Sequence, residues 1–320
     1  MSNQLVKTLF ACLFMMSPLV MKAQTDSTET KEEQDLSNLL ESEDQANDSG
    51  KKQYTTATFK TTRIANGHSI ENVGKGILDF RINHRFGALN GGFKEFFGLD
   101  NAVTRIGFDY GITDWLMVGI GRSTFMKEVD GFAKVRILRQ TDDNSMPVSL
   151  SYLGAASVQG VKLLENPAGT DYPFSNRLGY VNQLLIARKF SSAFSFQLMP
   201  THVHNNFVMY KDEPNDIFAL GAGGRLKLNK RLALTAEYYY QLGDRMRDSR
   251  NSFTFGLDIE TGGHVFQLMF SNSTGVSERS VIGGTTERWD KGQVHFGFNI
   301  SRVFTVVRPK EFKDSRNKIW

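Results

Sequence analysis

Apolar and polar residues alternate along most of this chain, beginning at Ile77. In "ILDFRINHRFG" apolar residues lie at Leu78, Phe80, Ile82 and Phe86, and polar residues lie between them at Asp79, Arg81, Asn83 and Arg85. A period of two sends successive side chains to opposite faces of a β-strand. The pattern therefore predicts a strand with one apolar and one polar face.

The same pattern recurs in later segments and gives twelve predicted strands in all. The later ones lie at about 101–112, 116–125, 131–140, 148–159, 177–190, 194–208, 216–229, 232–242, 252–262, 264–273 and 291–306. Most are close to the roughly 9–11 residues that a tilted strand needs to cross a bilayer.

The glycine-rich stretch "FALGAGGRLKLNKRLALTAEYYYQL", Phe218 to Leu242, has two possible interpretations. A dinucleotide-binding loop would need a third glycine at position 226, which is Leu226, and a helix after it. The alternation instead favours two strands joined at "NK". Gly221 and Gly223 would then make room for long side chains in a crowded interior.

Short and long connections alternate between the predicted strands. This rhythm, with an even number of two-faced strands, predicts a transmembrane antiparallel up-and-down β-barrel of about 12 strands, with both termini in the periplasm. A soluble sandwich would show the same alternation, but twelve consecutive long strands in an exported chain favour the barrel. A helical membrane protein is excluded, because the longest uncharged stretch, Ser145 to Val161, is rich in Ser and Gly and contains Pro147.

The N-terminus indicates export. Residues 1–23 have an early lysine, an apolar run from Leu9 to Met21 and a small residue, Ala23, before the expected cleavage point, as in a secretory signal peptide. The run is shorter than the roughly 20 residues of a membrane-spanning helix. Cys12 is the only cysteine, so cleavage leaves no thiol for disulfides, catalysis or metal binding.

Four further regions follow the signal peptide. Residues 24–53 are acidic and polar and predict a disordered linker. Residues 54–75 contain β-forming residues and then glycines, so they form a periplasmic segment before the barrel or a plug. As a plug they would fill the lumen or dock a periplasmic protein. The barrel is predicted at 76–308 and a C-terminal tail at 309–320.

Charged residues gather on the predicted inner faces of the strands. The proposed lumen-lining residues are Asp79, Arg81, Arg85, Arg105, Asp109, Lys134, Arg136, Arg225, Lys227, Glu237, Asp258 and Glu260. Bases outnumber acids in this set, so an open pore is expected to prefer anions. The whole chain has a formal net charge of +4, which suits an anionic membrane surface or solute, and an exported chain has little access to nucleic acid.

Candidate chemistry is sparse. No G-x-S-x-G, H-E-x-x-H or G-x-x-x-x-G-K motif occurs, and no H-x-S pattern of the outer-membrane phospholipase kind. In "THVH", His202 and His204 share one face of a strand and form a weak candidate pair for a metal. With no third ligand nearby, the simpler interpretation is that they line a polar lumen. We expect no resident metal, no cofactor and no catalytic residue.

Several motifs resemble a known family. "NGHSIE", "HRFG", "FDYGITD" and "VGIGRS" are similar to motifs of the β-barrel family catalogued as domain of unknown function 5777, found in Gram-negative outer membranes. The resemblance covers roughly residues 54–308. It implies location and fold, and no established activity or catalytic residue comes with it.

These observations predict an outer-membrane β-barrel in contact with lipid. We expect a narrow small-solute channel or a membrane partner of a periplasmic system, with residues 54–75 as the contact for a periplasmic protein. The alternative is a non-conducting structural or assembly barrel, and an outer-membrane enzyme is less favoured. In the first outer loop, 91–100 is expected to form one helical turn and fold inward.

Overall fold

The structure is a computed structural model that describes residues 53–163, 171–261 and 264–307. The predicted signal peptide, nearly all of the linker 24–53 and the tail 309–320 lie outside the described residues. The strands are β1 (Ile77–Ala88), β2 (Ala102–Gly111), β3 (Leu116–Ser123), β4 (Val129–Leu138), β5 (Ser149–Val158), β6 (Leu178–Lys189), β7 (Phe194–Asn205), β8 (Asp216–Lys227), β9 (Leu232–Leu242), β10 (Ser252–Thr261), β11 (His264–Ser271) and β12 (His295–Thr305).

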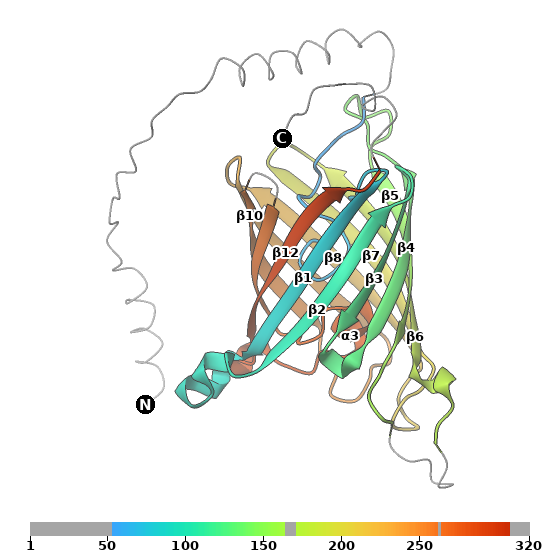
Figure 1. The fold of residues 1–320 in the computed structure, drawn as a ribbon, viewed down its shortest axis with the longest axis vertical. Helices are drawn as coiled ribbons and strands as arrows, with labels where there is room; N and C mark the ends of the chain where they lie inside the picture. Colours follow the sequence, from blue (N-terminus) through green and yellow to red (C-terminus); the bar gives the residue numbers. More distant parts are fainter. Residues whose placement is uncertain (1–52, 164–170, 262–263, 308–320) are drawn as a thin grey trace. The chain divides into compact units, whose positions relative to one another are not determined.

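The strands form one closed antiparallel barrel in chain order (Figure 1). Each strand pairs with its neighbours in sequence, and β1 pairs with β12 to close the sheet, with Ile82 opposite Ile300. Closure leaves no unpaired sheet edge, which a barrel surrounded by lipid requires. The predicted barrel of about twelve strands is confirmed. Among the described residues no helix is long and apolar enough to cross a membrane.

The barrel has two different ends. Most connections at one end, which we call the turn end, are short, such as those between β2 and β3 and between β8 and β9. The longer connections lie at the opposite, loop end. They carry the short helices α3 (Glu278–Gly283), η1 (Leu89–Gly98), η2 (Phe125–Lys127), η3 (Phe174–Arg177) and η4 (Trp289–Lys291). Figure 1 places the turn end at the top and α3 near the bottom.

The outer and inner faces differ as the alternation predicts. Outward side chains of β8, such as Phe218 and Leu220, are exposed on the barrel wall, whereas Arg225 on the same strand is buried inside. Apolar side chains face outward because hydrocarbon solvates them, while polar side chains find hydrogen-bond partners inside.

The interior also has an apolar side. Val181, Leu185, Met199, Val203 and Ile217, on β6, β7 and β8, point inward and are buried. They pack in one cluster with apolar residues from 54–75 and from α3. This side of the lumen is therefore a packed core, while the charged inner residues belong mostly to the other strands.

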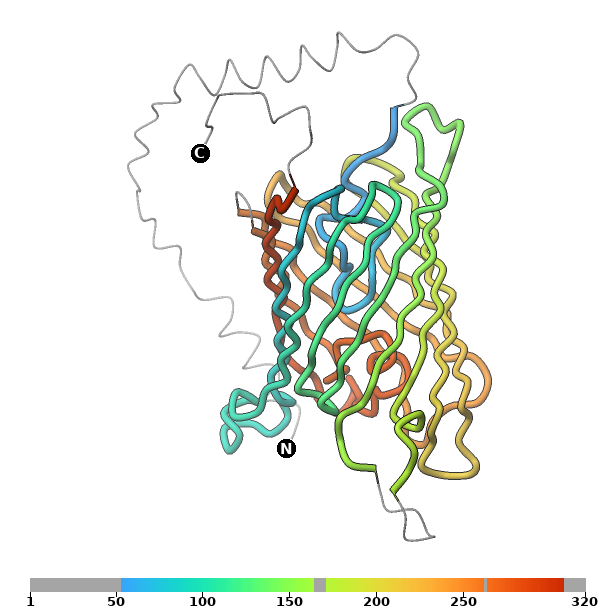
Figure 2. The backbone as a smooth tube through the Cα atoms, turned by 45° about the vertical axis from the view of Figure 1, so that its right-hand side comes forward, coloured from blue at the N-terminus to red at the C-terminus, as the bar shows by residue number. Residues whose placement is uncertain are grey.

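Residues 54–75, which we call the plug segment, lie inside the barrel. The chain enters at the turn end, where Tyr54 bridges Thr141 of the β4–β5 connection, and loops through the interior before β1 (Figure 2). Ile64, Ala65 and Ser69 have no exposed surface. Of the two roles open for this segment, the structure therefore places it within the lumen.

The long connection between β11 and β12 also folds into the lumen, at the loop end. Its helix α3 buries Arg279, Ser280, Val281 and Ile282. The expectation that 91–100 folds inward is wrong. That segment forms the 3-10 helix η1 but turns away from the barrel, and Phe93 is 82% exposed. The interior at this end is occupied by α3 instead.

Candidate functional site

The plug segment turns back on itself deep in the lumen. Arg63 and His68 pair in an isolated bridge, and the amide of Ile64 donates to the carbonyl of Gly67 at 2.9 Å. The turn between them is built from Ala65, Asn66 and Gly67, which belong in part to the "NGHSIE" motif. A tight turn leaves backbone N–H groups pointing outward from its tip, and these need partners in a buried setting.

Glu237 of β9 supplies those partners. Its buried carboxylate accepts hydrogen bonds from the backbone N–H groups of Ala65 at 3.2 Å, Asn66 at 2.9 Å and Gly67 at 3.1 Å. Three converging N–H donors form a concave binding site for an anion. The carboxylate of Glu237 on the barrel wall therefore binds the tip of the plug segment through three backbone N–H groups.

Gly67 is the residue that the tip requires. A Cβ atom at this position would overlap the hydroxyl of Tyr239, which stands next to Glu237 on the inner wall. Tyr239 in turn fits because Gly221 on the neighbouring strand β8 has no side chain, and Gly223 makes the same room for Ile64. The glycines of "GAGG" therefore accommodate a tyrosine of the barrel and an isoleucine of the plug segment.

Amide and guanidinium side chains complete the contacts of the tip. Asn66 accepts from Arg85 of β1 at 2.7 Å and donates to Thr254 of β10 at 2.8 Å. Asn299 of β12 donates to the carbonyl of Ala65. Two glutamines also donate to backbone carbonyls of the segment, Gln267 to Ile64 and Gln197 to His68. The tip thus joins strands from the beginning and the end of the barrel.

Two basic residues hold the chain on either side of the tip. Arg63 forms a buried ion pair with Asp109 of β2, at 3.1 Å. Lys134 of β4 has no exposed surface and donates to the carbonyl of Ser69 at 2.9 Å. Inward charges at mid-barrel are therefore engaged with the plug segment rather than with an open water-filled passage.

The entrance of the plug segment is fastened at the turn end. Arg225 of β8 donates to the carbonyls of Ala57 at 3.0 Å and Thr58 at 3.3 Å. Lys60 forms an ion pair with Glu260 of β10. The Lys60–Glu260 pair is more exposed than the contacts at the tip, so it contributes less to holding the segment in place.

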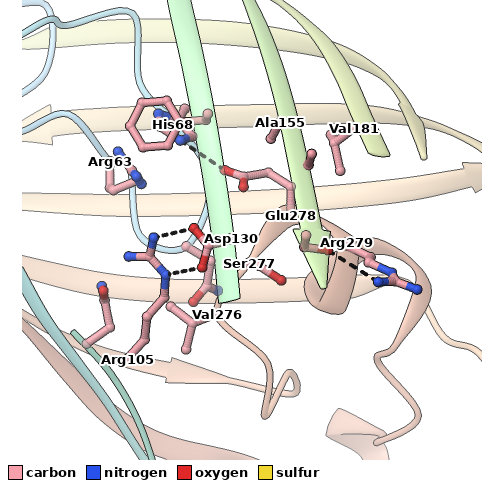
Figure 3. A pocket seen from close by; sticks show the side chains of 15 residues that line it. Arg63, His68, Arg105, Asp130, Ala155, Val181, Val276, Ser277, Glu278 and Arg279 are labelled. Atoms are coloured by element: carbon pink, nitrogen blue, oxygen red, sulfur yellow. Dashed lines mark hydrogen bonds and ion pairs between the residues drawn. The ribbon is translucent and has the colours of Figure 1, made fainter. Parts of the chain in front are cut away.

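The plug segment meets the inserted loop near the middle of the lumen. His68 Nε2 lies 3.6 Å from Glu278 Oε1 at the start of α3 (Figure 3). Close by, Arg105 of β2 forms an ion pair with Asp130 of β4. Burial lowers the pKa of His68 well below its usual range, aided by the nearby cations of Arg63 and Lys134. Burial raises the pKa of Glu278.

Little free space connects the two ends of the lumen. The cavity between His68, Arg105 and Glu278 has about 20 Å³, enough for roughly one water molecule. Larger cavities of about 420 Å³ and 400 Å³ lie on either side, toward the turn end and the loop end. The plug segment and α3 therefore close the passage between two vestibules.

The structure places the predicted lumen-lining residues on the inner side of their strands. Nine are buried: Asp79, Arg81, Arg85, Arg105, Asp109, Lys134, Arg225, Glu237 and Asp258. Arg136, Lys227 and Glu260 are partly exposed near the turn end. The structure brings Glu237, Arg85, Asp109, Lys134 and Arg225 together on the plug segment.

The interpretation that His202 and His204 line the lumen is wrong. Both face outward from β7, because Thr201, Val203 and Asn205 take the inward positions. Each imidazole lies within hydrogen-bonding distance of Asp216 Oδ1, at 2.7 Å and 2.8 Å. No group of three or more potential ligands suited to a metal ion occurs among the described residues.

Sequence reasoning missed three acidic residues of the site, Asp130, Glu128 and, on α3, Glu278. Asp130, on the inner face of β4, pairs with Arg105. Glu128, just before β4, accepts hydrogen bonds from Ser277 at 2.7 Å and Ser280 at 3.0 Å of the inserted loop. Extending the alternation of β4 back to Val129 would have placed Asp130 inside.

The closed strand array, apolar outer wall and internally anchored plug define a plugged β-barrel of the membrane-bound class. The chain belongs to the family described as membrane bound beta barrel domain (DUF5777), whose model matches residues 59–304. The resemblance stated from the sequence motifs is confirmed. No curated protein sequence matches the chain.

Among solved structures the chain is similar to other barrels. The NanC porin shares 11% identity with a TM-score of 0.44, covering 72% of this chain and 100% of that chain. An outer membrane channel from Pseudomonas putida F1 shares 12% identity with a TM-score of 0.45, covering 73% and 98%. The outer membrane phospholipase A of Escherichia coli shares 9% identity with a TM-score of 0.41, covering 78% and 98%.

Proposed function

We propose that the protein is an outer-membrane channel for small solutes, held closed by its own plug segment. The turn end would face the periplasm and the loop end the exterior, as in barrels with short periplasmic turns. The plug segment would act as a gate that leaves the lumen or shifts within it. A periplasmic protein acting on residues 54–75 would supply the opening signal.

The observation that carries this proposal is the chemistry of the plug contacts. On the side of β1, β2 and β9 to β12 the segment is held by side-chain hydrogen bonds and ion pairs, among them those of Glu237, Arg63 and Asn66. Water can replace such partners when the segment leaves, so the exposed wall remains solvated. In a permanently closed barrel, we would expect apolar side chains to pack against the plug segment on these strands too, as they do on β6, β7 and β8.

A planar-bilayer experiment tests the proposal. The purified chain without its signal peptide should show little or rare conductance, and removing residues 24–75 should give frequent, long-lived openings. Removing residues 24–53 alone should leave conductance low and is the matched control. A folded barrel that stays silent after removal of 24–75 would reject the channel function and favour a structural or assembly barrel.

The proposal includes no catalytic step. Most charged side chains described in the lumen are engaged with the plug segment or the inserted loop, and Arg105 and Asp130 pair with each other, which supports a gate rather than a reaction centre. A hydrolytic role would need a nucleophile with an adjacent base, and no catalytic motif of that kind occurs in the sequence.

A further inference from the structure

The vestibule at the loop end is a pocket with mainly apolar walls. Its cavity measures about 400 Å³, a size typical of small-molecule sites. We call it the loop-end pocket. Its apolar lining includes Phe125, Met126, Phe207, Met209 and Met246, which come from three different connections between strands. Methionine side chains adapt to irregular ligands, so such a wall suits a flexible apolar group.

A single buried guanidinium separates this pocket from the interior. Arg279 of α3 lines both the loop-end pocket and the small cavity beside His68, and is 7% exposed. Figure 3 shows its side chain directed away from the Arg105–Asp130 pair. An anion entering from the loop end would meet this group at the inner limit of the pocket.

Hydrogen bonds and a glycine of the barrel wall fix the position of the Arg279 side chain. Its Nε donates to Asn205 at 2.7 Å and its Nη1 donates to Ser157 at 3.2 Å. Gly179 of β6 leaves the space for the guanidinium, because a Cβ there would overlap Cζ of Arg279. A mobile surface arginine would not need a glycine on the facing strand.

Among the residues that the structure describes, the guanidinium of Arg279 has only neutral hydrogen-bond partners. These are an amide, a hydroxyl and, more weakly, the carbonyl of Arg177, and the described residues contain no ion pair that involves Arg279. The closest carboxylate in electrostatic effect is that of Glu128, which is occupied by the hydroxyls of Ser277 and Ser280. Burying a cation without an ionic partner is costly, so the site favours the arrival of an anion.

We propose that the loop-end pocket binds an organic anion with a flexible apolar chain, such as a medium-chain carboxylate. The carboxylate would pair with Arg279, and the apolar chain would contact the methionine and phenylalanine walls. An inorganic anion would leave these walls without a partner, and a neutral apolar molecule would leave the guanidinium unpaired. The pocket lies on the loop-end side of the plug segment, so binding requires no open pore and goes beyond the proposed channel function.

Calorimetric titration with sodium octanoate tests this site. The full mature chain is placed in lipid nanodiscs, and heats from empty nanodiscs are subtracted. We expect one saturable site per chain. Octan-1-ol, which has the same chain length without the charge, should bind about tenfold more weakly or not at all, since a charged hydrogen-bonded pair is lost.

Three variants locate the binding. Arg279→Gln should weaken octanoate binding by about tenfold or more. Arg245→Gln removes a charge from the residue before Met246 that does not itself line the pocket, and it should leave binding unchanged. Met246→Trp should reduce the binding of octanoate by filling the pocket, and it keeps the test valid if the Arg279 variant fails to fold.

Three results would overturn the proposal. They are the absence of saturable octanoate binding to the wild type, equal binding of octanoate and octan-1-ol, and octanoate binding unchanged in a folded Met246→Trp or Arg279→Gln variant. A silent channel that still binds octanoate would reject the proposed function alone, so the two proposals fail separately.

Discussion

The carboxylate of Glu237 accepts the backbone N–H of Asn66 at 2.9 Å, across 171 residues of sequence. Both groups are buried, and the neighbouring amides of Ala65 and Gly67 converge on the same carboxylate. A charged side chain of the wall thus holds a backbone turn of the plug segment by donors that any residue type could provide. The contribution of these hydrogen bonds to the closed state can be measured.

Replacing Glu237 with alanine should release the plug segment. The change leaves three buried N–H groups without acceptors, and unsatisfied groups of this kind cost about 1–3 kcal/mol each. We expect the ratio of closed to open channels to fall at least about tenfold in single-channel recordings. Glu260→Ala is the matched control, because it removes a partly exposed partner of Lys60 at the turn end. Equal opening in the two variants would show that the tip does not hold the segment.

Arginine at Leu234 and at Thr235 should have different effects. Leu234 faces outward on β9, where an arginine within the hydrocarbon costs on the order of 2–4 kcal/mol, so the variant should lose the heat-modifiable folded band on gels. Thr235 faces inward and is buried against the filled lumen. Its arginine variant should keep the folded band and show more frequent conductance, because it crowds the lumen. Equal loss of folding would contradict the assigned faces.

The inner wall should make the opened pore prefer anions. In a chain lacking residues 24–75, the seven basic residues of the predicted lumen set still outnumber its five acids and Asp130 taken together. The reversal potential in a salt gradient should therefore indicate anion selectivity, and Arg225→Glu should reduce or reverse it. Arg225→Lys preserves the charge and should preserve the selectivity. Cation preference in the unsubstituted pore would refute the charge argument.

Acid should loosen the plug segment through His68. Because its pKa in the plugged state lies well below the ordinary 6.5, the released state binds more protons, and the plugged state loses stability as the pH falls below about 6.5. Glu278 acts in the opposite sense, since its raised pKa means that the plugged state favours its protonated form.

The measurement is the open probability of the full mature chain between pH 7.5 and pH 5, in the Glu278→Gln background to isolate the histidine. We expect openings to become more frequent as the pH falls, and His68→Gln should remove this dependence. An acid response that persists without His68 would assign it to another group.

The strands could be predicted because their signal is local. Alternation along β9 is enough to place Leu234 outside and Thr235 inside, and the predicted range 232–242 matches the observed strand. The prediction that His202 and His204 face the lumen failed because, in this part of β7, polar histidines lie on the outer face and the apolar Val203 lies on the inner face. The inward positions next to them, such as Val203, pack against the apolar cluster that includes α3.

The contents of the lumen could not be predicted from local patterns. The tip of the plug segment is bound through backbone N–H and C=O groups, which nearly every residue type carries and which leave no sequence signal. Its side-chain contacts join Asn66 to Thr254, across 188 residues. The prediction that 91–100 folds inward failed because it depended on distant residues as well. Nothing in the sequence of 91–100 indicates that α3 occupies the lumen at the loop end.

The tip of the plug segment also connects parts of the wall that lie far apart in the sequence. Residues 54–75 precede every strand in the chain, yet their partners include Asn299, on the last strand. Asn66 is bound by Arg85 of β1 and itself binds Thr254 of β10, while Asn299 of β12 binds the preceding residue, Ala65. The finished wall therefore encloses the segment, and the segment's contacts link strands on both sides of the β1–β12 seam.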